Sequence, residues 1–181
     1  MDFNRALGAR IQALAMTFPA VVVTGSRQVG KTTLLRSLFP GHRYVSLDIP
    51  SEASRAELEP ELFLAQGAGR MLIDEVQYAP QLFKHLKVAI DADRSLRGQF
   101  ILSGSQKFEL MREVSDSLAG RVAVVELEGL SCEEVCAQQD LPPWITSLAR
   151  GWFPELWAQP EIPASEFYRS YIATYLERDV R

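Results

Sequence analysis

The chain has 181 residues, of which 47% are hydrophobic, and its 19 basic and 23 acidic side chains give a formal net charge of −4. This is the composition of a globular protein with one main core, and the acidic balance gives no electrostatic reason to bind nucleic acid or an anionic membrane. No apolar run has the length of a membrane span, and the N-terminus, with Asp2, lacks the apolar stretch of a secretory signal. We therefore expect a cytoplasmic protein.

Apolar residues recur along the first 127 residues with two periods, one typical of helices and one typical of strands. In chain order the expected elements are a helix over about 3–16, a strand at 20–24, a helix at 33–38, a strand at 43–48, a short helix broken near Pro60, a strand at 70–75, a helix over about 80–93, a strand at 99–103, a helix at 108–118 and a strand at 121–127. Ser54 and Glu57 have the spacing of a capping box. Five strands that alternate with helices predict an α/β fold of three layers, in which helices cover both faces of a mostly parallel sheet.

The pattern changes after Leu127, where prolines and tryptophans punctuate a loop-rich passage. Ser165 then has the position of an N-cap for a last helix, which meets no stop signal before Arg181. We therefore expect a core domain over residues 1–128. Residues 129–181 are expected to form an irregular arm and a terminal helix, the start of a lid or of a further domain.

Residues Gly25–Thr32 match the pattern Gly-x-x-x-x-Gly-Lys-Ser/Thr and lie between an expected strand and an expected helix. The glycines let successive backbone N–H groups point inward, and the N-terminus of the helix adds partial positive charge, so the loop suits a phosphate group. The expected nucleotide-binding residues are Gly25, Ser26, Arg27, Gln28, Val29, Gly30, Lys31, Thr32 and Thr33.

Two carboxylates, Asp74 and Glu75, follow a short apolar strand at the position where the carboxyl edge of a parallel sheet would lie. The Thr32 hydroxyl and Asp74 are the expected ligands of Mg²⁺, directly or through water. Asp48 is the rival metal ligand, but the Ile49-Pro50 pair that follows it is typical of a turn. Glu75 is the expected catalytic group, because an ATPase needs a residue that orients or deprotonates water.

Four further side chains are candidates for the same site. Ser105, with Ser103 as the second choice, follows the fourth strand and is expected to contact the attacking water or the γ-phosphate. Gln77 either orients Glu75 or is a plain surface amide. Arg121, before the fifth strand, either stabilises developing charge in its own chain or a neighbouring subunit, or has a structural role.

Five segments in this order resemble the prokaryotic AAA-type ATPases, members of the AAA+ superfamily that carry an uncharacterised C-terminal domain. The segments are 22–33, 72–77, 102–106, 117–121 and 175–181. The resemblance implies an αβα P-loop NTPase core in which the strand that precedes Ser105 lies between those that precede Gly25 and Asp74. It implies that Lys31, Thr32, Asp74, Glu75 and Ser105 act on the nucleotide, and that this chain corresponds to the N-terminal ATPase part.

The expected function is ATP binding and Mg²⁺-dependent ATP hydrolysis, coupled to an unknown client or to the C-terminal domain of the family. A slow nucleotide switch is the alternative, and a small-molecule kinase is disfavoured by Glu75 and by the lack of an evident Arg-rich lid. The absence of an Asn-Lys-x-Asp string favours ATP over GTP. A homo-oligomer or a protein client is the expected partner.

Overall fold

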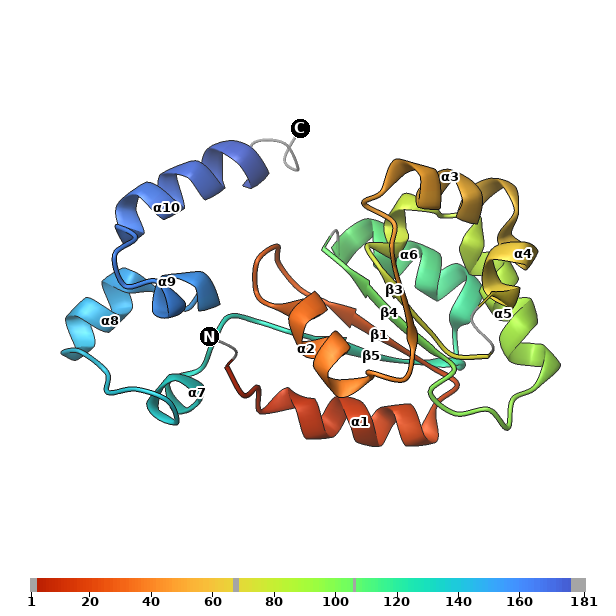
Figure 1. The fold of residues 1–181 in the computed structure, drawn as a ribbon, viewed down its shortest axis with the longest axis horizontal. Helices are drawn as coiled ribbons and strands as arrows, with labels where there is room; N and C mark the ends of the chain where they lie inside the picture. Colours follow the sequence, from red (N-terminus) through yellow and green to blue (C-terminus); the bar gives the residue numbers. More distant parts are fainter. Residues whose placement is uncertain (1–2, 67–68, 106, 177–181) are drawn as a thin grey trace. The chain divides into compact units, whose positions relative to one another are not determined.

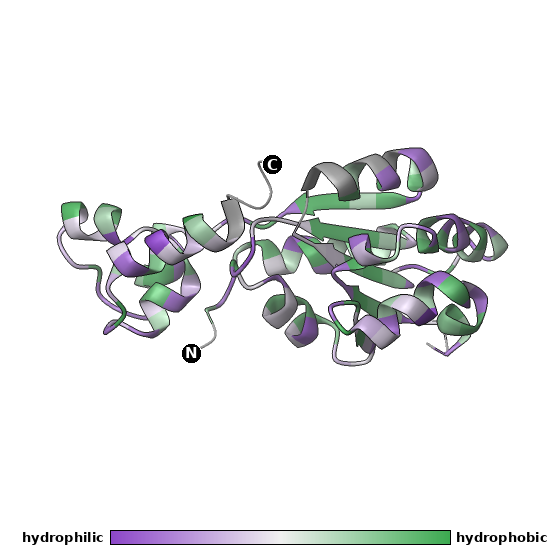
Figure 2. Ribbon diagram, turned by 90° about the horizontal axis from the view of Figure 1, so that it is seen from above, coloured by the Kyte–Doolittle hydropathy of each residue, from purple (hydrophilic) through white to green (hydrophobic). Residues whose placement is uncertain are grey.

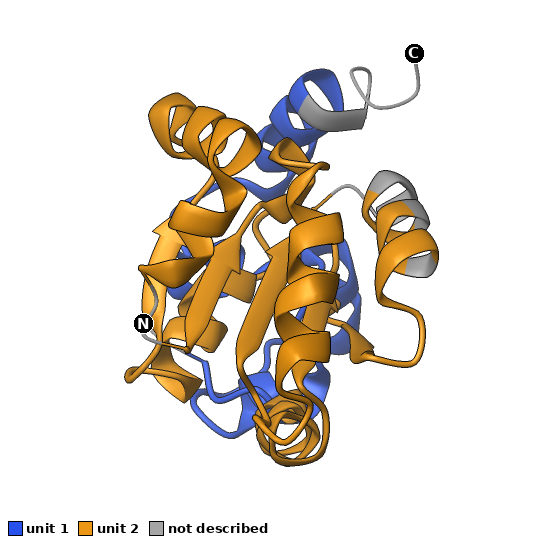
Figure 3. Cartoon of the chain, turned by 90° about the vertical axis from the view of Figure 1, so that its right-hand side faces the viewer, with its two compact units in different colours: residues 1–5, 129–181 blue, residues 6–128 orange. Residues whose placement is uncertain are grey.

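The computed structural model describes residues 3–66, 69–105 and 107–176. The chain forms two compact units, which Figure 3 colours separately. Unit 2 holds Ala6–Glu128, and unit 1 holds Met1–Arg5 together with Gly129–Arg181. Residues 3–5 therefore belong with the C-terminal segment and not with the sheet that follows them in sequence.

A parallel sheet forms the centre of unit 2 (Figure 1). Its strands are β1 (Ala20–Thr24), β2 (Arg43–Ser46), β3 (Met71–Asp74), β4 (Phe100–Gly104) and β5 (Val122–Glu126). They lie in the order β2-β3-β4-β1-β5, and every neighbouring pair is parallel. The expected α/β fold is confirmed, and β4 lies between β1 and β3 as the family resemblance implies.

Helices cover both faces of this sheet (Figure 1). They are α1 (Leu7–Thr17), α2 (Lys31–Leu38), α3 (Pro50–Leu58), α4 (Pro60–Ala65), the 3-10 turn η1 (Val76–Tyr78), α5 (Leu82–Ala92) and α6 (Lys107–Leu118). Helices α1 and α2 contact one another and the central strands, whereas α3 to α6 enclose the main hydrophobic cluster on the other face.

The three central strands are buried along their whole length, which explains their continuous apolar sequence (Figure 2). Ala20 and Val22 of β1 join the main cluster with Phe83 and Leu86 of α5, and Val21, between them in sequence, is equally buried. Because successive strand side chains point to opposite faces, a sheet with two covered faces needs apolar residues along most of each strand. The buried polar exceptions, Thr24, Asp74 and Ser103, lie at or near the carboxyl ends.

The capping box expected at Ser54 and Glu57 is wrong. Helix α3 already begins at Pro50, so Ser54 lies inside the helix. A proline at the first helical position has the required φ and lacks only an N–H that would have no partner in the helix. The break expected near Pro60 is confirmed, since α3 ends at Leu58 and α4 begins at Pro60.

Unit 1 contains more helix than its proline-rich sequence predicts. Its elements are α7 (Cys132–Cys136), α8 (Trp144–Arg150), α9 (Pro154–Ala158), α10 (Ala164–Tyr171) and the π-helical turn η2 (Ile172–Leu176). Ser165 does not cap the last helix, because α10 begins at Ala164 after Pro163. The remainder of that expected helix, residues 177–181, lies outside the described residues.

Unit 1 contains a buried ion pair at Glu134 and a stacked pair of tryptophans. Ser131 and Glu134 form a capping box at the start of α7, and Arg5 Nε donates to Glu134 Oε2 at 3.1 Å. The rings of Trp152 and Trp157 stack with their centroids 5.6 Å apart. Across the described residues of both units, the helices are too short or too polar to cross a membrane.

Candidate nucleotide site

The loop between β1 and α2 has a backbone that glycine alone can follow without strain at two points. Gly25 has φ 142° and Gly30, which precedes α2, has φ 90°. A Cβ atom on Gly25 would lie 2.1 Å from the carbonyl oxygen of Leu127, whose N–H donates to Thr24 O at 2.8 Å. The first glycine of the loop is therefore required by close packing as well as by its φ angle.

The other side chains of the loop divide into exposed and anchored ones. Ser26, Gln28 and Thr33 are exposed, whereas Val29 is buried in unit 2. Gln28 also has a positive φ, 63°, without being glycine. Arg27 Nη2 donates to the hydroxyl of Tyr78 at 3.3 Å, which ties the loop to η1.

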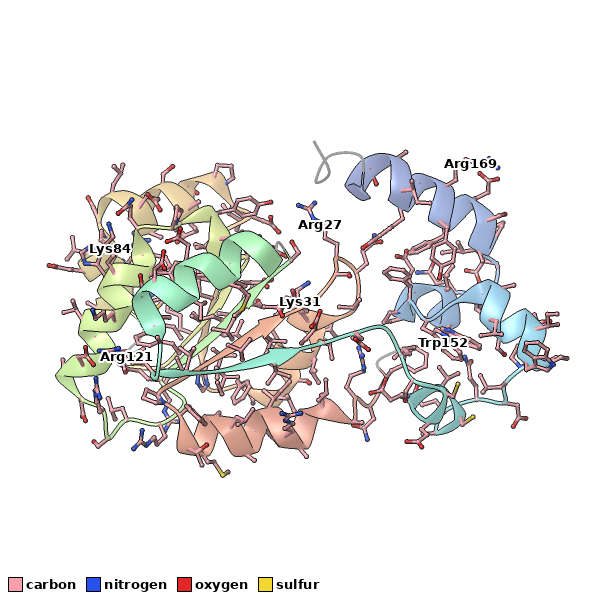
Figure 4. All side chains as sticks on the ribbon, turned by 180° about the vertical axis from the view of Figure 1, so that it is seen from behind. Arg27, Lys31, Lys84, Arg121, Trp152 and Arg169 are labelled. Atoms are coloured by element: carbon pink, nitrogen blue, oxygen red, sulfur yellow. The ribbon has the colours of Figure 1, made fainter. Side chains whose placement is uncertain are left out.

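Lys31, at the start of α2, is a buried cation that is only 5% exposed. Its Nζ donates to Gly25 O at 2.9 Å and to Ser26 O at 2.8 Å. Burial lowers the pKa of Lys31, while the charges of Glu75 and Asp74 act in the opposite direction. The amine of Lys31, labelled in Figure 4, thus contacts the loop carbonyls and lies within electrostatic reach of both carboxylates.

Asp74, at the end of β3, accepts hydrogen bonds from three hydroxyl groups. Thr32 Oγ1 donates to its Oδ2 at 2.7 Å, Tyr44 OH donates to the same oxygen at 3.2 Å, and Ser103 Oγ donates to Oδ1. Burial, followed by the charge of Asp74, raises the pKa of Tyr44. The structure thus unites the two expected metal ligands and assigns Ser103 to Asp74. Sequence analysis missed Tyr44. The one sequence feature that could have indicated it is its position two residues before Ser46, the residue that pairs with Asp74.

Glu75 follows in a left-handed backbone conformation, with φ 54°. Its Oε2 accepts three hydrogen bonds, from Ser105 Oγ at 2.9 Å, from Ser105 N at 3.2 Å and from Gln77 Nε2 at 2.5 Å. Ser103 and Ser105 therefore face different carboxylates, and the hypothesis that Gln77 orients Glu75 has a direct contact behind it.

The strand, loop and helix that carry this site fall within a known family. Residues 17–136 match the family model described as AAA domain. The chain belongs to the AAA domain family. Uncharacterized proteins Mb2031c of Mycobacterium bovis and Rv2008c of Mycobacterium tuberculosis are each 34% identical to it over 179 residues, which are 98% of this chain and 40% of theirs. The chain thus spans 40% of the length of these curated relatives.

Solved structures share the fold of this AAA domain at low sequence identity. The Walker-type ATPase PABY2304 of Pyrococcus abyssi has a TM-score of 0.59 at 16% identity, over 98% of this chain and 71% of that one. The AMPPCP-bound DnaA of Aquifex aeolicus has a TM-score of 0.55 at 17% identity, over 96% of this chain and 64% of that one.

Asp48, the rival metal ligand, lies in the turn after β2 of the AAA domain and is exposed. Its backbone N–H donates to Ser46 Oγ at 3.4 Å, and the N–H of Ile49 donates to Ser46 O at 3.4 Å. Burial, followed by the charges of Glu75 and Asp74, raises the pKa of Asp48. Asp48 therefore adds to the negative potential around the site, whereas Asp74 has the contact with Thr32.

Arg121 is the one expected catalytic residue of the AAA domain that the structure does not bring to the loop. Arg121 precedes Val122, which pairs with Ala20, the first residue of β1, whereas the loop follows the last residue of β1. Arg121 and Lys31 therefore lie toward opposite edges of the sheet (Figure 4). Arg121 Nε and Nη2 donate to the two oxygens of Asp91 at 2.9 and 2.8 Å, and this pairing holds the pKa of Asp91 far below its usual range. The hypothesis that Arg121 acts in its own chain's site is therefore wrong, because Arg121 and the loop lie at opposite edges of the sheet.

Proposed function

We propose that this AAA domain binds ATP with Mg²⁺ and hydrolyses the bond to the terminal phosphate. The observation that carries the proposal is the juxtaposition of the Thr32 hydroxyl with Asp74 at 2.7 Å, next to Glu75 and at the foot of a phosphate-binding loop. A bound phosphate, a metal and an attacking water each find a suitable group here.

The donor set fits Mg²⁺, which prefers hydroxyl, carboxylate and water oxygens over nitrogen and sulfur. Thr32 and Asp74 would hold the ion. The hydroxyls of Tyr44 and Ser103 donate to the oxygens of Asp74 and so fix the orientation of its carboxylate. Magnesium, when bound, offsets the negative charge of the phosphates during transfer.

The chain's own residues divide the remaining work. The loop N–H groups and Lys31 bind the phosphates. To do so, the Lys31 amine gives up its hydrogen bonds to the carbonyls of Gly25 and Ser26 and donates to the phosphates instead. Glu75 orients the attacking water and accepts its proton, and Ser105 holds Glu75 in place. AMPPCP, an ATP analogue, is bound by the DnaA of similar fold, which supports an adenine nucleotide as substrate.

Mg²⁺ removal tests this proposal directly. We expect steady-state phosphate release from ATP to need Mg²⁺ and to stop when EDTA is added. Thr32→Val keeps the side-chain shape but removes the hydroxyl ligand, so the Mg²⁺ concentration for half-maximal rate rises roughly tenfold. Thr17→Val, on α1 at the other end of the sheet, serves as the control. Release at full rate in EDTA, or none from the wild type, contradicts the proposal.

A neighbouring copy is the remaining way for Arg121 to act, and we propose that it does so in a homo-oligomer. Arg121→Ala then slows phosphate release by about tenfold or more through the loss of a charge-assisted contact. Arg94→Ala is the matched control, because Arg94 shares the Asp91 carboxylate but is 62% exposed.

A mixture of two impaired variants tests whether Arg121 acts on the site of a neighbouring copy. An equimolar mixture of Arg121→Ala and Glu75→Gln regains activity if each copy supplies what the other lacks. A mixture no more active than its components would contradict action between copies. Coupling of hydrolysis to a protein client, through sequence that the longer relatives carry, belongs to the same proposal.

A further inference from the structure

The side chain of Gln77 is buried, at 9% exposed, and the two ends of its amide have opposite environments. Its Nε2 donates to Glu75 Oε2 at 2.5 Å. Its Oε1 is buried and accepts no hydrogen bond from the described residues. The amide thus donates one hydrogen bond to a carboxylate and has one buried acceptor that lacks a donor among the described residues.

Glu75 fixes this orientation of the amide, and Gly104 leaves room for it. Rotating it by half a turn would place Oε1 against the carboxylate of Glu75, where two acceptors repel each other. On the other side, the amide packs against Gly104, the last residue of β4, where a Cβ atom would lie 2.5 Å from Gln77 Oε1. The glycine at position 104 therefore leaves the space that Gln77 occupies.

A buried acceptor without a donor destabilises the folded state, and an apolar side chain of equal length would remove that cost. Local arrangements that lower stability without stabilising another part of the fold occur preferentially at functional sites. Here the destabilising amide provides a hydrogen bond to Glu75, whose backbone is left-handed and whose side chain is charged.

We propose that Gln77 is a positioning residue for Glu75, an inference that rests on the proposed hydrolysis. The three donors that reach Glu75 all meet Oε2, one from Gln77 and two from Ser105. Among the described residues, no donor contacts Oε1 of Glu75. One oxygen of the carboxylate is clamped, and the other is left to accept the proton of the attacking water.

The test compares Gln77→Met with Gln99→Met in the full chain. Gln99 is the matched control, because it too is buried with an Oε1 that lacks a donor, but it precedes β4 at the opposite edge of the sheet. We expect Gln77→Met to lower kcat about ten- to a hundredfold through misplacement of Glu75, with KM for MgATP within about twofold. The Tm stays equal or rises in both variants, and Gln99→Met keeps its kcat.

Opposite movement of turnover and stability is the signature of a positioning role. An unchanged kcat in Gln77→Met, or a kcat that falls together with the Tm, overturns the proposal. Gln77→Ala, which demands less space beside Gly104, provides the same comparison if the methionine variant does not fold.

If the wild type releases no phosphate, the proposed function is contradicted. A separate measurement then tests the clamp, the contact of Gln77 with Glu75 Oε2. The Tm values of Glu75→Gln, Gln77→Met and the double variant are then compared. Shifts that do not add show that the two side chains interact, and the clamp stands without hydrolysis. Additive shifts overturn it.

Discussion

Glu75→Gln is expected to lower steady-state phosphate release about 10²- to 10⁴-fold, the range for loss of a general base. The substitution keeps the size of the side chain and an oxygen that accepts from Ser105, but it removes the group that takes a proton from water. ATP affinity therefore stays within about twofold, because the loop and Lys31 hold the phosphates. Phosphate release and the affinity for a fluorescent ATP analogue are measured on the same preparation.

A surface glutamate provides the control for Glu75. Glu61→Gln changes the same chemistry on α4, where the side chain is 87% exposed. We expect wild-type release from that variant. If Glu75→Gln releases phosphate at the wild-type rate, Glu75 is not the base and the chain is at most a nucleotide switch.

Lys31→Met is expected to weaken ATP binding roughly 10- to 150-fold, which corresponds to the loss of hydrogen bonds to a charged group. Methionine retains the buried aliphatic stem, so the fold remains while the amine is lost. Binding of the same fluorescent analogue is measured by titration. Lys84→Met, an exposed lysine on α5, is the control (Figure 4). Equal affinity in the wild type and Lys31→Met would remove Lys31 from the site.

The same variant reports on the buried charge of Lys31. Because burial lowers its pKa below the ordinary value of 10.5, the unfolded chain binds more protons than the folded chain between the folded pKa and 10.5. The wild type therefore gains stability with rising pH in that window, and Lys31→Met does not. The difference in Tm between the two, followed by thermal unfolding from pH 7 upward, should move in favour of the wild type.

Much of the fold and part of the site follow from local sequence patterns. Continuous apolar runs predict β1, β3 and β4 because parallel strands covered on both faces need apolar side chains along most of their length. Asp74 and the loop meet because parallel strands bring their carboxyl ends to one edge of the sheet. The same argument applies to Arg121, which precedes its strand, so the strand direction already places it at the opposite edge.

Other features depend on contacts that periodicity does not encode. Ser103 and Ser105 lie two apart and share a face, so their sequence spacing does not reveal that one contacts Asp74 and the other Glu75. The helices α7 and α9 have five residues each, too few for a helical pattern to stand out among prolines and tryptophans. Such short helices are stabilised by packing, as the stacked tryptophans of unit 1 indicate.

The close approach of Gly25 to the carbonyl of Leu127 separates two kinds of constraint within one loop. A side chain at position 25 would collide with the backbone that leaves β5, whether or not a nucleotide ever binds. A descendant that had lost hydrolysis would still need this glycine to fold, whereas Lys31 and Glu75 carry the charged groups that the proposed phosphate binding and hydrolysis need. Among distant sequences of this fold, the glycine therefore records inherited architecture, and the lysine and glutamate record retained chemistry.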